Sequence, residues 1–229
     1  KKELINVGVS FKTESDTEVV LNGYIQYGLE FFKKLKGFYA IAIFNKKNNS
    51  LLLTRDSVGK KPLYYCHLES EFIFSSELSP LISVLSSTPS VNLNGLSHYL
   101  WKGYYVDYHS AYKNVFQIIP GEFIIVNMDD LSLKKIESNT TLRIKSAEKK
   151  QINAINTVED SLAKSISRRF ISDVPVSILL SGGVDSSLIT ILAKKYTTSD
   201  FETFYLGYQS GFDQFKKIAQ EITSTLSIK

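Results

Sequence analysis

The sequence is short of cysteine and of long apolar runs, and each shortage excludes a class of protein. Cys66 is the only cysteine among 229 residues, so no intrachain disulfide can form, as is usual in reducing compartments. The segment from Phe38 to Phe44 is among the longest apolar runs, and it is too short to cross a bilayer. The first ten residues have no signal-peptide or transit-peptide character. These absences predict a cytoplasmic protein with no membrane partner.

The chain also lacks a strong charge of either sign and a metal-binding histidine pattern. Its hydrophobic fraction of 43% and charged fraction of 22% are those of an ordinary globular protein. The formal net charge is +4, and the lysines occur in scattered pairs, which argues against a nucleic-acid partner. His67, His98 and His109 have no metal-ligand spacing, so we expect packing or surface roles for them.

The hydrophobic pattern divides the chain into two regions of different class. Up to residue 137 it predicts antiparallel strands with helices interspersed. Residues 138–150 are polar and lose the period, which is typical of a linker. From residue 151 onward strands alternate with helices, which predicts a parallel sheet with crossover helices. The prediction is an α+β domain at 1–137, a linker, and an α/β domain at 151–229.

Two local patterns in the first region predict scaffold features. In "ESDTEVV" the Ser15 side chain can accept from the amide of Glu18, and Glu18 can reach back to Ser15, which is a capping box. In "RDSVGKKPLYY" we expect Arg55 and Asp56 to pair locally within a turn. Cys66 lies within the predicted strand "YYCHL", with its neighbouring histidine on the opposite face, so we expect it in the core and not as a nucleophile.

The segment "SILLSGGVDSS", residues 177–187, places glycines, hydroxyls and a carboxylate between a buried strand and a helix. Ligands of open parallel sheets sit beyond the carboxyl ends of the strands. Glycines let backbone amides approach an anion, and a helix N-terminus attracts it. The hydroxyls of Ser181, Ser186 and Ser187 can donate to phosphate oxygens.

Asp185 changes what this turn can bind. A carboxylate repels a polyphosphate unless a divalent cation lies between them, and Mg²⁺ bridges the two groups in this way. The lysine of the Walker pattern G-x-x-x-x-G-K-[ST] is absent. The turn is therefore predicted to hold a magnesium-bound pyrophosphate unit. The alternative is a tight turn that uses Gly182 and Gly183 for geometry and Asp185 for capping.

At this point the sequence resembles a known family. "LLSGGVDSS" is similar to the pyrophosphate loop of the ATP-pyrophosphatase superfamily, and the stretch from "SDTEVVLNGYIQYG" to "FSSELSPL" resembles the later part of the class II glutamine amidotransferase domain. Their order along the chain is that of glutamine-dependent asparagine synthetases. The resemblance implies an N-terminal nucleophile hydrolase-like α+β fold joined to an adenine nucleotide alpha hydrolase-like α/β fold.

The resemblance also implies a chemistry. In that family aspartate is adenylated by ATP with release of pyrophosphate, and ammonia from glutamine then attacks the acyl-adenylate. It implies ATP and Mg²⁺ as cofactors, glutamine and aspartate or a related acid as substrates, and it allows a homodimer. Asp185 would be the metal ligand, and Asp16 would hold the α-ammonium group of glutamine, although an acid in a first helical turn is stabilising by itself. The implied ATP and pyrophosphate residues are Leu180, Ser181, Gly182, Gly183, Asp185, Ser186 and Leu206.

Several parts of the family pattern find no match in the chain. No residue matches the N-terminal cysteine nucleophile, the early arginine or the Asn-Gly pair of the oxyanion site, and the acceptor-binding residues would lie beyond Lys229. We therefore expect an internal fragment that is inactive in both half-reactions. Three alternatives stay open: aspartate as acceptor, another carboxylate such as a sugar acid, peptide or lactam-forming substrate, and a non-catalytic nucleotide-binding module.

Overall fold

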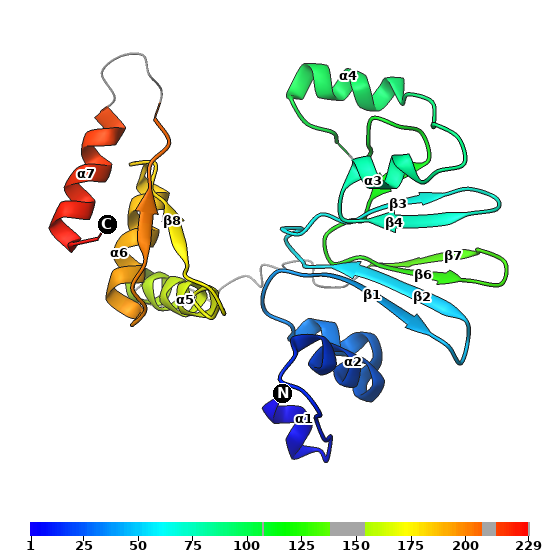
Figure 1. Cartoon of the computed structure of the whole chain (residues 1–229), viewed down its shortest axis with the longest axis horizontal. Helices are drawn as coiled ribbons and strands as arrows, with labels where there is room; N and C mark the ends of the chain where they lie inside the picture. Colours follow the sequence, from blue (N-terminus) through cyan, green and yellow to red (C-terminus); the bar gives the residue numbers. More distant parts are fainter. Residues whose placement is uncertain (107, 138–153, 208–213, 229) are drawn as a thin grey trace. The chain divides into compact units, whose positions relative to one another are not determined.

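The computed structural model divides the chain into two compact units, Lys1–Ile144 and Lys145–Lys229. It describes residues 1–106, 108–137, 154–207 and 214–228 (Figure 1). The predicted linker, 138–150, lies outside the described residues. No helix in the described part of the chain combines the length and the apolar character that crossing a membrane requires.

The first unit is built from two antiparallel sheets, with strand orders β1-β2-β6-β7 and β4-β3-β5. The strands are β1 (Ala40–Asn45), β2 (Ser50–Arg55), β3 (Tyr64–His67), β4 (Phe72–Ser75), β5 (Val115–Gln117), β6 (Phe123–Asn127) and β7 (Leu133–Ile136). The helices are α1 (Lys2–Asn6), α2 (Asp16–Tyr27), the 3-10 helix η1 (Gly28–Lys34), α3 (Leu78–Ser83) and α4 (Leu93–Lys102).

These elements stack in the order helix, sheet, sheet, helix. Helices α2 and η1 cover one face of the larger sheet, where the rings of Phe32 and Phe123 pack edge to face at 5.3 Å between centroids. The other face packs on the smaller sheet, with Leu53 and Tyr65 in one cluster, and α3 closes the far side. The arrangement confirms the predicted α+β class.

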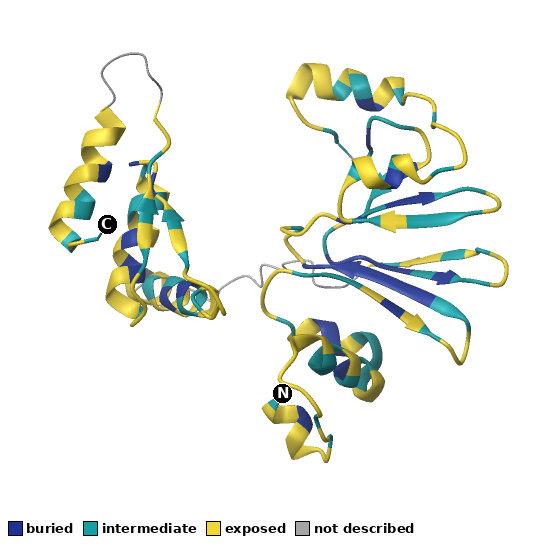
Figure 2. Cartoon of the chain, viewed as in Figure 1, coloured by how far each residue is buried: buried dark blue, intermediate teal, exposed yellow. Residues whose placement is uncertain are grey.

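Strand β2 lies inside this sandwich, which explains its composition. It pairs with β1 on one side and β6 on the other. Because successive side chains point to opposite faces, Leu51 and Leu53 enter the cluster between the sheets while Leu52 enters the one under the helices. Figure 2 shows the resulting buried band along β2.

The second unit contains α5 (Ala154–Arg169), β8 (Ser177–Leu179), α6 (Val184–Tyr196), β9 (Glu202–Phe204) and α7 (Gln214–Leu226). Strands β8 and β9 pair in parallel, with Ile178 opposite Thr203, and α6 connects them. The predicted α/β class with a parallel sheet is confirmed. Helices α5 and α6 share a core that contains Ile166, Leu192 and Ala193.

The start of α2 lies where it was predicted, but the capping box is wrong. Ser15 Oγ accepts from the amide of Thr17 at 3.2 Å, while the Glu18 carboxylate accepts from the amides of Lys12 and Thr13 at 2.8 and 2.7 Å. These hydrogen bonds hold the pKa of Glu18 below its ordinary value. Glu18 therefore fixes the segment before the helix instead of the cap, because two unpaired amides lie within its reach.

The local ion pair expected between Arg55 and Asp56 is also absent among the described residues. Arg55 instead lies 5.9 Å from the centre of the Tyr108 ring, and Asp56 accepts from backbone amides. Cys66 is buried against α3, as predicted for a packing residue, and burial raises the pKa of its thiol.

Leu53 offers a direct test of the sandwich core. Its side chain is fully buried, so Leu53→Ala leaves a cavity between the sheets, and we expect a loss of about 3 kcal/mol in the free energy of unfolding of the first unit. Ile25→Ala, at a position that is 72% exposed on α2, is the matched control and should change it by less than about 0.5 kcal/mol. Urea unfolding measures both, and equal losses would contradict this core.

Candidate functional site

The glycine turn begins where the parallel sheet ends. The Leu180 amide donates to the carbonyl of Phe204 at 2.9 Å, so the pairing continues one residue past β8. Leu180 is 1% exposed as a whole residue, so it offers a ligand little direct contact and instead anchors the start of the turn. The chain then turns through 181–183 into α6, whose N-cap is Gly183. This is the edge at which open parallel sheets bind ligands.

Gly182 has surroundings that only glycine fits. Its φ is +77°, and a Cβ added there would lie 2.2 Å from the carbonyl oxygen of Phe215 in the first turn of α7. At Gly183 an added Cβ would meet only Ser181 Oγ, at 3.6 Å. Gly183 makes no side-chain cap, so the first amides of α6 keep their hydrogen-bonding capacity for another acceptor.

The serines of the turn have different surroundings. The Ser186 hydroxyl donates to the Gly183 carbonyl at 3.2 Å, and its oxygen lies 3.0 Å from Ser181 Oγ. Because Ser186 has one hydroxyl proton, Ser181 is the donor in that second bond. Both hydroxyls therefore brace the turn. Ser187 Oγ, in contrast, is buried without a hydrogen-bond partner in the part of the chain that the structure describes.

Asp185 lies exposed in the first turn of α6, at the same end as the uncapped amides. No group of three His, Cys, Asp or Glu side chains that could hold a metal occurs among the described residues. A single carboxylate is nevertheless a sufficient protein ligand for Mg²⁺ when phosphate oxygens and water complete its coordination. Amides that attract an anion and a carboxylate that attracts a cation together fit a magnesium-bound phosphate group.

Leu206 lies apart from this turn in sequence but at the same edge of the sheet. It follows β9 by two residues, and its side chain is 88% exposed. Because β8 and β9 are parallel, their carboxyl ends open on one side. The structure thus brings the continuous segment 180–186 together with the segment after β9, which offers an apolar surface of the kind that a nucleotide base contacts.

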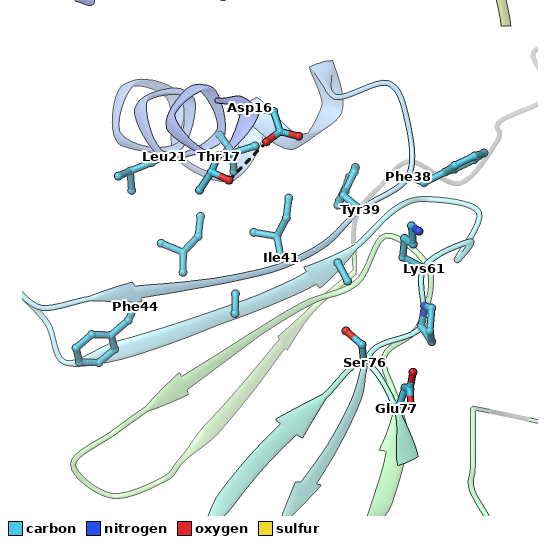
Figure 3. A pocket seen from close by; sticks show the side chains of 15 residues that line it. Asp16, Thr17, Leu21, Phe38, Tyr39, Ile41, Phe44, Lys61, Ser76 and Glu77 are labelled. Carbon is cyan, nitrogen blue, oxygen red and sulfur yellow. Dashed lines mark hydrogen bonds between the residues drawn. The ribbon is translucent and has the colours of Figure 1, made fainter. Parts of the chain in front are cut away.

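Asp16 belongs to a different site, in the first unit. It is the first residue of α2, and it lines a pocket of about 800 Å³ together with the outward side of β1 (Figure 3). Most of the lining residues are apolar, and they include Ile41 and Phe44 from opposite faces of β1. Thr17 Oγ1 lies 3.5 Å from Asp16 Oδ1, and no backbone amide of the described residues donates to this carboxylate.

Two charged residues of this pocket were missed by the sequence reasoning. Lys61, in the turn after β2, and Glu77, directly before α3, line the same pocket as Asp16. Lys61 lies in "RDSVGKKPLYY", a segment for which the sequence predicts only a scaffold role. The pair of lysines before Pro62 is the one feature of that segment that could have indicated a binding role. A pocket with a mostly apolar lining and side chains of both charges suits a small zwitterion with a methylene chain, such as an amino acid.

Comparison with known proteins gives the two units a family. Residues 1–137 match the family model of the glutamine amidotransferase domain, and residues 157–228 match that of asparagine synthase. The chain therefore belongs to the glutamine amidotransferase family, in the branch that carries an asparagine synthase region after the amidotransferase domain.

Individual relatives agree with this assignment. Glutamine-hydrolysing asparagine synthetase 1 of Bacillus subtilis is 32% identical over 100% of this chain and 36% of its own length. Asparagine synthetase B of Escherichia coli is 28% identical over 84% of this chain and 29% of its own length. Amidase chyE of Penicillium rubens is 27% identical over 78% of this chain and 26% of its own length. The chain thus spans between about a quarter and a little more than a third of the length of these relatives.

The contrast between the two glycines of the turn can be tested by substitution. Gly182→Ala puts a side chain at positive φ and against the Phe215 carbonyl, so we expect it to lower the free energy of unfolding of the second unit by about 2 kcal/mol or more. Gly183→Ala is the control and should cost less than about 1 kcal/mol, because its added Cβ meets no backbone. Urea unfolding followed by circular dichroism measures the difference, and equal stability of the two variants would refute this geometry.

Proposed function

We propose that the chain is part of a glutamine-dependent asparagine synthetase. The enzyme forms asparagine from aspartate, ATP and glutamine through an acyl-adenylate, with release of AMP and pyrophosphate. One observation carries the proposal: an amidotransferase domain and an asparagine synthase region follow each other on one chain, and the second holds the Ser-Gly-Gly-Val-Asp-Ser turn at a strand-to-helix junction. In this proposal residues 1–137 are the later part of the amidotransferase domain, and residues 151–229 are the first part of the synthetase domain.

In the synthetase half, the turn 181–186 would hold the pyrophosphate part of ATP. The amides that open α6 donate to its oxygens, and Gly182 and Gly183 let the backbone approach it. Ser181 and Ser186 keep the turn in shape through their mutual hydrogen bond. Asp185 would hold Mg²⁺, which neutralises the charge that develops on the leaving pyrophosphate. Exposed Leu206 would contact the adenosine part, and buried Leu180 would hold the start of the turn that faces it.

In the amidotransferase half, Asp16 would hold the α-ammonium group of glutamine. Its carboxylate is exposed, lines the pocket over β1, and accepts no backbone amide of the described residues. An ionised carboxylate with free lone pairs is the partner that an alkylammonium group needs. The apolar residues of β1 that line the pocket would accommodate the methylene groups of the glutamine side chain.

Two classes of acid could accept the amide nitrogen in the proposed reaction. Aspartate is supported by the two asparagine synthetases at 32% and 28% identity, and another carboxylate stays the alternative because the relative at 27% identity is named an amidase and not an asparagine synthetase. Incubation of the full-length protein with each candidate acid, followed by mass spectrometry of the amide product, distinguishes them. We also propose a cytoplasmic location, with which a single buried cysteine is compatible.

Asp185→Ala tests the role of the turn. In the full-length protein, loss of the metal-holding carboxylate should lower acceptor-dependent AMP and pyrophosphate formation by about a hundredfold or more, while glutamine hydrolysis continues. Asp200→Ala, also exposed in the second unit, is the matched control and should keep both activities. Release of ADP and phosphate by the unmodified protein, in place of AMP and pyrophosphate, would overturn the proposed reaction.

A further inference from the structure

The turn that carries Lys61 is fixed by a buried carboxylate. Asp56 is 1% exposed at the end of β2, and its Oδ1 accepts from the amides of Val58 and Lys60 at 3.3 and 3.0 Å. Its Oδ2 accepts from the amide of Lys61 at 3.0 Å. Three amides of one turn therefore converge on one side chain, and the backbone at Lys61 has little freedom.

The surroundings of Asp56 strengthen this constraint. Its own amide donates to the carbonyl of Tyr39 at 3.0 Å, and Tyr39 lines the same pocket as Lys61. Gly59, at φ +66°, lets the turn pass so close to Arg55 and Pro120 that an added Cβ would lie 2.7 Å from each side chain. Asp56 thus ties the turn to a second residue of the pocket wall.

Asp56 keeps its charge in this position. Burial alone would raise the pKa of its carboxyl group, but the amides of Lys60 and Lys61 hold that pKa below its ordinary value. The carboxylate is therefore ionised at neutral pH and can accept all three amides. The neutral amide of an asparagine could not, because its nitrogen is a donor and would face an amide donor.

The Lys61 side chain is free to serve a ligand. It is exposed, and in the part of the chain that the structure describes its ammonium group makes no ion pair and no hydrogen bond. In the view of Figure 3, Tyr39 lies between Asp16 at the start of α2 and Lys61 in the turn. An ammonium group at this wall can bind a carboxylate, as the Asp16 carboxylate can bind an ammonium group.

We propose that Asp56 is a positioning residue of the amino acid pocket, which through the turn 56–61 holds Lys61 as a cation for the carboxylate of the bound amino acid. This inference rests on the proposed function, in which glutamine occupies the pocket. It assigns to the chain a second polar determinant of glutamine binding beside Asp16. It also gives the "RDSVGKK" segment a role in recognition in addition to its role as scaffold.

A double-mutant cycle separates positioning from stability. The full chain is titrated calorimetrically with L-glutamine as the unmodified protein, as Lys61→Met, as Asp56→Asn and as the double variant. We expect Lys61→Met to raise Kd about tenfold, since one charge-assisted contact is lost. Asp56→Asn should also raise the Kd for L-glutamine. If Asp56 acts through Lys61, the double variant should bind within about twofold of Lys61→Met alone.

Two controls keep the test interpretable. Asp130→Asn alters another aspartate that caps a turn of the same unit, with Oδ1 2.9 Å from the Ser132 amide, and Asp130 does not line the pocket, so Kd should stay unchanged. Thermal unfolding of each variant reports folding, and Lys61→Met alters an exposed side chain, so its binding result stands even where Asp56→Asn fails to fold.

The outcomes are distinct. Unchanged binding by Lys61→Met, or additive losses in the double variant, would overturn the inference and leave glutamine in the pocket. No binding of L-glutamine by the unmodified chain would overturn the glutamine assignment itself, while formation of AMP and pyrophosphate in the full-length protein would still support the synthetase half of the proposed function.

Discussion

The parallel pairing of β8 with β9 is the constraint on which the glycine turn 181–183 depends. It fixes the end of β8 through the Leu180 amide and the Phe204 carbonyl, and the chain must then reverse within three residues to begin α6. The Phe215 carbonyl occupies the space of a side chain at Gly182, so the turn has a single residue type that fits there. Backbone amides are exposed at this edge because no nearby side chain caps them.

Periodicity predicted most of this architecture, because burial follows from where apolar residues recur. The antiparallel strands before residue 137 and the alternating strands and helices of the second unit lie in the regions where the pattern of apolar residues predicted them. The glycine turn could be located from the sequence because all of its residues stand in one short segment. A site of this kind needs no knowledge of distant contacts once the flanking strand and helix are recognised.

The pocket of the first unit was only partly predictable, because its residues come from segments far apart in sequence. Asp16, Lys61 and Glu77 line one pocket only because the fold places α2, the turn after β2 and the start of α3 around β1. The capping box failed for a related reason: several amides lay within reach of Glu18, and local sequence does not say which one remains unpaired after folding.

The carboxylates of the chain show how backbone amides separate scaffold from site. Asp56, Glu18 and Asp130 each accept at least one backbone amide, so the fold uses their lone pairs. Hydrogen bonds hold all three pKa values below the ordinary range, and for Asp130 the Ser132 side chain contributes more than the Ser132 amide. Asp16 and Asp185 accept no backbone amide among the described residues, although both stand in the first turn of a helix. A carboxylate at a helix start that caps nothing retains its full capacity for an external cation. The two acids singled out from the sequence are thus among the carboxylates whose charge the fold leaves unused, and an ammonium group and a metal ion are the two kinds of cation that the proposed reaction requires.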